Sequence, residues 1–136
     1  MRWRPFLFLI CLAVGACGEM AQGLSDVQVV HSKVSRAMPR ETIGVNLNNG
    51  KYLTVTLVNS PLKALAADEK GNKVSEIARL AYDAFPRRDE LESIGVVFME
   101  QKRYFFFFNY SDGRDAYFMK ASDFRPVKPA AEGNSP

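Results

Sequence analysis

The chain of 136 residues contains few of the side chains on which most catalytic and metal sites depend. It has one histidine, His31, so no second imidazole exists for a typical zinc site. It also lacks a Gly-x-Ser-x-Gly segment, a glycine-rich phosphate loop and a Cys-x-x-Cys pair. We therefore expect a protein that is not an enzyme and that has no catalytic residues, no metal and no cofactor.

A strong excess of one charge is also missing. The sequence has 18 basic and 15 acidic residues, which gives a formal net charge of +3. Loss of Arg2 and Arg4 with a cleaved leader would leave 16 basic against 15 acidic residues. Because proteins that bind nucleic acid usually carry a basic patch or stripe, we expect no nucleic acid partner.

The first 17 residues have the organisation of a secretory signal peptide. Two arginines are followed by an apolar run from Phe6 to Val14, and small residues precede Cys17. The run is shorter than the ~20 apolar residues that a membrane-spanning helix needs. We predict a signal peptide over residues 1–16, and the alternative is the start of a buried N-terminal helix.

The end of this leader, Val14-Gly15-Ala16-Cys17, resembles the lipobox of bacterial lipoproteins. The resemblance implies that Cys17 receives a diacylglyceryl group and becomes the first residue of a protein anchored in a membrane. It also implies a place in the bacterial cell envelope, facing the periplasm, and Gly18 favours the outer membrane because an aspartate there is the inner-membrane signal. The alternative is cleavage by the ordinary signal peptidase, which would leave a soluble periplasmic protein.

The rest of the chain is predicted to form one globular domain. Residues 17–23 would be the lipidated cysteine and a tether, residues 24–124 the domain, and residues 125–136 a disordered tail that contains proline, glycine and serine. Residues 25–38 have apolar residues at helical spacing behind a Ser25-x-x-Gln28 capping box, and a strand is the alternative.

Alternating apolar residues at 43–47 and 53–57 predict a β-hairpin. A three-residue loop of Asn48, Asn49 and Gly50 would pair Val45 with Leu53 and keep the apolar face continuous. Gly50 would then have a left-handed conformation.

A second helix is predicted to start at Asp68 or Asn72 and to end near Phe85, because Pro86 disfavours helical geometry in the residue before it. Three strands would follow, at 94–99, 104–110 and 115–120. Turns at 101–102 and 112–113 would pair Phe98 with Phe105 and Phe107 with Phe118. The predicted fold is a small α+β domain of order α-β-β-α-β-β-β, with one or two helices and an antiparallel sheet of about five strands.

The last three predicted strands are apolar on both faces, so each face needs a cover. The helix that ends near Phe85 can cover one face. The other can be covered by the 25–38 helix, by a protein partner or by lipid, and its aromatic residues are a candidate partner surface: Tyr104, Phe106, Phe108, Tyr110 and Tyr117. These observations favour a non-enzymatic interaction or structural module of the envelope. The alternative is a small envelope hydrolase or a ligand-binding accessory protein whose site has no linear motif.

Overall fold

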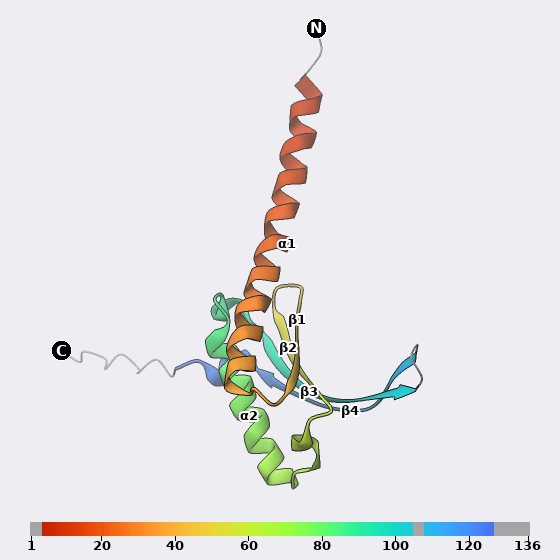
Figure 1. Cartoon of the computed structure of the whole chain (residues 1–136). Helices are drawn as coiled ribbons and strands as arrows, with labels where there is room; N and C mark the ends of the chain where they lie inside the picture. The colour runs from red at the N-terminus through yellow and green to blue at the C-terminus, as the bar shows by residue number, and fades with distance from the viewer. Residues whose placement is uncertain (1–3, 105–107, 127–136) are drawn as a thin grey trace, which may run out of the picture.

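The computed structural model describes residues 4–104 and 108–126, which form two helices that lie on one face of a four-stranded sheet (Figure 1). The elements are α1 (Arg4–Ala37), β1 (Thr42–Asn48), β2 (Tyr52–Val58), α2 (Ala67–Ala84), β3 (Ser93–Tyr104) and β4 (Phe108–Lys120). Short 3-10 turns occur at Pro61–Ala64, Arg88–Glu90 and Ala121–Phe124.

The fold is α+β, as predicted, but the sheet has four strands in the described part of the chain and it is mixed. The strand order is β1-β2-β3-β4, and β2 and β3 are parallel. Two parallel strands need a long crossover, usually a helix, and α2 supplies it by returning the chain to the end of the sheet where β2 begins. The prediction of a purely antiparallel sheet was therefore wrong at this pair.

Helix α1 confirms the helical interpretation of residues 25–38, but it does not begin at Ser25. The helix runs without a break from Arg4 to Ala37, so the predicted tether and capping box both lie within it. After Pro5 in the first turn, no proline occurs before Pro39, and the apolar leader continues directly into the amphipathic segment. Val30 and Val34 are fully buried against the sheet, whereas the first half of the helix projects beyond the sheet (Figure 1).

The β1–β2 hairpin forms where the alternation predicts it, with a different register. Val45 lies opposite Val55, not Leu53, so the pairing is shifted by two residues. The reason is that both Asn49 and Gly50 have positive φ, at 52° and 70°, which moves the loop to residues 49–51. Because the shift is an even number, the same side chains still face the helices. The predicted left-handed conformation of Gly50 is confirmed.

Helix α2 closes the core from the same side. Its apolar stripe is buried as predicted, and the helix ends at Ala84, directly before Phe85 and Pro86. The stripe packs against the apolar residues of β2 and β3 that face it. The core consists mainly of Val30, Val34, Leu53, Val55, Leu57, Val74, Ile77, Ala81, Tyr82, Phe85, Ile94, Val96 and Phe98.

The last part of the sheet contains two long strands instead of three short ones. β3 and β4 have 12 and 13 residues and run through both predicted turns. Phe98 pairs with Asp115 and Gly95 with Phe118, so both predicted phenylalanine pairs were wrong. Gly113, which suggested a turn, instead falls at a β-bulge, where the register shifts between Met99 and Glu100.

Beyond the pair of Val58 with Met99, strand β2 has ended and β3 and β4 continue as a two-stranded ribbon (Figure 1). Asn59 fixes the point where the ribbon leaves the sheet. Its side chain donates to the Gln101 carbonyl at 3.1 Å and accepts from the Gln101 backbone N–H at 2.7 Å. Over residues 4–104 and 108–126, no helix is both long and apolar enough to cross a bilayer.

Candidate functional site

The face of the sheet opposite the helices carries apolar side chains that no helix of the described chain covers. Its side chains alternate with the buried residues of the same strands, and both helices pack on the other side. We call this surface the open face, and we define it by Tyr52, Thr54, Thr56, Val58, Val97, Met99, Ala116 and Phe118. None of these eight side chains carries a charge at neutral pH.

Phe118 is the most exposed aromatic residue of the open face, with 68% of its surface accessible. Its ring nevertheless has a fixed place, because it lies directly on the backbone of Gly95 in β3. A Cβ atom at position 95 would come within 2.7 Å of Phe118 Cε1 and 3.4 Å of Thr54 Oγ1. Glycine at position 95 is therefore required for the ring to rest against the sheet. The result is an aromatic side chain that contacts the sheet and is also available to a partner.

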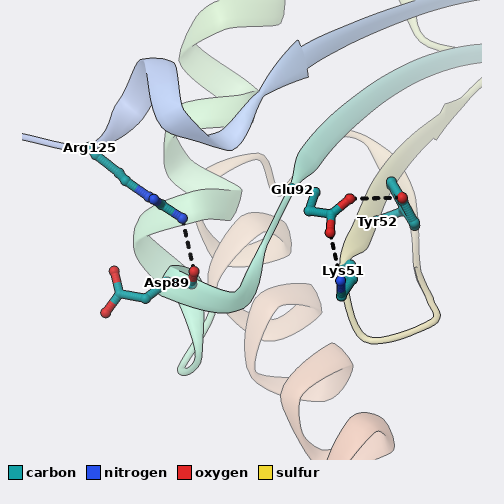
Figure 2. Close-up of polar contacts among 5 residues, drawn as sticks. All are labelled: Lys51, Tyr52, Asp89, Glu92 and Arg125. Carbon is teal, nitrogen blue, oxygen red and sulfur yellow. Dashed lines mark hydrogen bonds and ion pairs between the residues drawn. The ribbon is translucent and has the colours of Figure 1, made fainter.

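A polar cluster borders the open face where β2 and β3 begin, as Figure 2 shows. Glu92 Oε1 forms an ion pair with Lys51 Nζ at 2.6 Å, and the Tyr52 hydroxyl donates to Glu92 Oε2 at 2.8 Å. The backbone of the same two segments is also joined, since the Glu92 N–H donates to the Lys51 carbonyl at 2.9 Å. These contacts fix the direction of the exposed Tyr52 ring.

The cluster changes the ionisation of its members. The hydrogen bond from Lys51, together with that from Tyr52, holds the pKa of Glu92 below its usual value. The same hydrogen bonds to Glu92 raise the pKa of Lys51 and the pKa of Tyr52. All three groups are exposed, so the pairs orient side chains and contribute little to folding. None of the shifts brings a group toward neutral pH, where a general acid or base would have to titrate.

The end of the described chain is held beside this region. Arg125 Nη2 donates to the Asp89 carbonyl at 2.9 Å (Figure 2), and Arg79 Nη1 donates to the Phe124 carbonyl at 3.0 Å. Arg125, the first residue of the predicted disordered tail, is therefore held by a hydrogen bond to the loop before β3. Residues 127–136 of that prediction lie outside the described residues.

The structure places Tyr117, one residue of the predicted partner surface, on the face that the helices cover. Tyr117 lies opposite Val96 on the helix-covered face, where its ring meets Phe98 edge-on at 6.2 Å between centroids. Tyr117 is therefore on the wrong face for the predicted surface. In the ribbon, Tyr104 pairs with Phe108 and Lys102 with Tyr110, while Phe106 lies outside the described residues.

Sequence reasoning also missed members of the open face. The predicted pair of Phe107 with Phe118 placed Phe118 on the face opposite the candidate partner surface, and Tyr52 was not singled out as a surface residue. One signal could have identified Phe118: a glycine within an otherwise bulky strand often marks a close approach by another group, and Gly95 is such a residue.

A second feature is a groove of about 870 Å³ between α1 and the β1–β2 hairpin. Its apolar walls come from both elements, and Met20 and Leu24 at its edge are 75% and 69% exposed. The groove is lined by Met20, Gly23, Leu24, Val27, Val45, Asn46, Leu47, Asn49, Gly50, Lys51, Arg87 and Glu90.

The charged residues of the groove are engaged with other side chains. Arg87 Nε donates to Asp26 Oδ2 at 2.8 Å, and Arg87 Nη1 donates to Glu90 Oε2 at 2.9 Å. Asp26 is 5% exposed, so this ion pair ties α1 to the loop before β3. Lys51 is paired with Glu92. The groove thus offers mainly apolar surface to a ligand.

The described residues contain no group of three or more histidine, cysteine or acidic side chains that could hold a metal ion. His31 lies on the surface, where its Nε2 atom is 3.2 Å from the Ile43 carbonyl and joins α1 to β1. Comparison of the chain with known protein families, with curated proteins and with solved structures finds no match.

Proposed function

We propose that this chain is a lipid-anchored protein of the bacterial cell envelope that acts as a non-enzymatic interaction module and binds a protein partner on its open face. The observation that carries the proposal is the sheet surface opposite the helices, which has an uncharged centre, is covered by no helix of the described chain, and holds Phe118 on Gly95. Sheet faces that carry apolar side chains are normally covered, either by helices or by a second sheet. The lipobox resemblance at Cys17 supports the anchor, and Gly18 supports the outer membrane.

The chemistry of the open face defines the kind of partner. Its threonine, valine and methionine side chains are partly buried, and two aromatic residues, Tyr52 and Phe118, are more exposed. Aromatic side chains are enriched at protein–protein interfaces. A partner with an apolar, weakly charged surface fits this face. Because no charged pair is needed at its centre, the complex should depend little on salt.

The second candidate is a ligand-binding accessory protein, which the groove between α1 and the hairpin favours. Its volume lies within the ~300–1,000 Å³ that is usual for small-molecule sites. The two candidates are compatible, because the groove and the open face use different residues: Val45 and Leu47 line the groove, while Thr54 and Thr56 belong to the open face.

Site-specific photocrosslinking in intact cells tests the open face. A photoreactive amino acid at Ala116, an exposed position beside Phe118, should give a discrete product with one partner. The matched control is Ser75, an exposed position on α2. We expect Phe118→Ala to remove the product from position 116 without lowering the amount of protein. Equal products from positions 116 and 75, or a product that Phe118→Ala leaves unchanged, would reject the open face as a docking surface.

The anchor is tested separately. Cys17→Ser should abolish incorporation of radiolabelled fatty acid and leave an unprocessed or mislocalised precursor, because the modified cysteine is the substrate for processing in the family that the lipobox resembles. Label that still enters the Cys17→Ser protein would contradict the anchor, and it would leave the open face unaffected.

A further inference from the structure

The groove between α1 and the β1–β2 hairpin has walls suited to a flexible hydrocarbon. Its apolar lining is aliphatic: Leu24 and Val27 come from α1, and Val45 and Leu47 come from β1. Val27, Val45 and Leu47 are half-buried, so they form a floor, and Leu24 stands at the edge. A hydrocarbon chain placed here would cover exposed apolar surface on both elements.

The charges around the groove do not suit a charged or strongly polar ligand. Arg87 is occupied by Asp26 and Glu90, and Lys51 is occupied by Glu92. A ligand that needed these groups would have to break existing ion pairs. The asparagines at the hairpin end, Asn46 and Asn49, are the remaining polar residues of the lining.

The groove is lined by residues of α1 that follow Cys17 closely in the sequence, and this proximity identifies a specific occupant. Cys17 precedes Met20 by three residues and Leu24 by seven in the same helix, and residues at this spacing share one helical face. At ~1.5 Å per residue, Met20 and Leu24 are about 5 and 10 Å along the helix from position 17. We propose that the groove holds one acyl chain of the lipid attached to Cys17, an inference that rests on the proposed lipid anchor.

The covalent attachment gives this occupant an advantage over any free lipid. A group tethered a few residues from its site has an effective concentration in the millimolar range. The arrangement also has a consequence for the anchor itself. One acyl chain in a bilayer holds a protein only marginally, whereas two hold it stably. A chain taken up by the groove therefore weakens membrane attachment, so that the protein can leave one membrane for another surface.

The test uses the full chain, made in cells that incorporate a photoactivatable diazirine fatty acid. After illumination and proteolysis, a fragment that contains residues 42–51 should be joined through the crosslinked acyl chain to the fragment that carries Cys17. Gly23→Phe should lower this crosslinking at least tenfold, because a Cβ atom at position 23 lies 4.0 Å from Leu47 Cδ2 and the ring extends into the groove. Gly71→Phe is the matched control, since nothing lies within 4 Å of a Cβ atom at position 71 in α2.

Replacing a glycine within a helix does not weaken the helix, so both variants should fold. Leu24→Gln provides a second readout, because it changes only an exposed side chain and should also reduce the crosslink. Two results would reject the groove as the site of the acyl chain and still support the anchor. In the first, Cys17 carries label but Gly23→Phe and Leu24→Gln leave the crosslinks unchanged. In the second, Cys17 carries label and the acyl chain crosslinks to membrane lipid alone. Absence of label on Cys17 would overturn both the anchor and this inference.

Discussion

The contact between Phe118 and Gly95 predicts a measurable coupling between two residues on a surface. About a third of the Phe118 side chain is covered, since 68% is exposed. A fully buried aromatic residue covers ~150–250 Å², so a third corresponds to about 50–80 Å² and to ~1–2 kcal/mol at ~25 cal/mol per Å². We expect Phe118→Ala to cost that amount.

Gly95→Ala should displace the ring, because the new Cβ atom would lie 2.7 and 2.9 Å from two ring carbons of Phe118. The variant loses the ring contact but gains ~0.5–1 kcal/mol from replacing glycine in a strand, so its net cost should be about 0.5–1 kcal/mol. In a Phe118→Ala background the same change should instead stabilise by ~0.5–1 kcal/mol. The coupling energy is then about 1–2 kcal/mol, within the range known for residues in contact.

Urea unfolding of the four proteins of this cycle measures the coupling, provided that the slope with urea is unchanged. Gly44→Ala is the control, since its Cβ atom would lie at an ordinary 3.8 Å from Thr56 Cβ and should not couple to Phe118. Additive effects of Gly95→Ala and Phe118→Ala would refute the idea that the ring is held on the glycine. The same variants, used in the crosslinking experiment, should reduce partner capture, because a displaced ring no longer has a fixed position.

Three further predictions follow from the sheet and its border. In urea unfolding, Asn59→Ala should lower the free energy of unfolding by ~2 kcal/mol, because alanine loses the two hydrogen bonds to Gln101 and also disfavours the φ of 54°. Asn59→Gly should lower it by only ~1 kcal/mol, because glycine loses the same hydrogen bonds but adopts this φ without strain. Gly50→Val should cost ~1 kcal/mol or more, since its φ is 70°, and no loss of stability would contradict that turn. In an NMR titration, Glu92→Gln should lower the pKa of Tyr52 toward its ordinary value. Because the pKa of Glu92 is lowered, this carboxylate stabilises the fold above its ordinary pKa, and the stabilisation is lost as the pH falls through the folded-state pKa. Glu92→Gln should remove this dependence of stability on pH.

Much of the fold could be predicted from local pattern. The stripe from Val74 to Phe85 identified the buried face of α2, and alternation identified the buried face of the hairpin. The left-handed Gly50 was also predictable, because a tight turn between two strands needs positive φ and glycine adopts it without strain. These features depend on residues a few positions apart.

The candidate site could not be predicted from local sequence pattern in the same way. The aromatic run at 104–110 directed attention to the ribbon, while the open face depends on the pairing of Gly95 with Phe118. A strand exchanges its two faces when its register shifts by one residue. Since the predicted turn at 112–113 is in fact a bulge, β4 was assigned to the opposite face, and Tyr117 and Phe118 exchanged roles.

The sequence by itself determined which side chains are apolar at helical or alternating spacing, that a hairpin forms with a left-handed Gly50, and where α2 ends, because each of these is decided by neighbours along the chain. The tertiary structure decided that β2 and β3 are parallel, that α1 and α2 lie on one face, and that no helix of the described chain covers the other face. It also decided that Phe118 rests on Gly95 and that α1 and the hairpin enclose a groove near position 17. The physical reason is that these features arise from contacts between segments far apart in the chain, whose pairing depends on the packing of the whole domain and not on any local pattern.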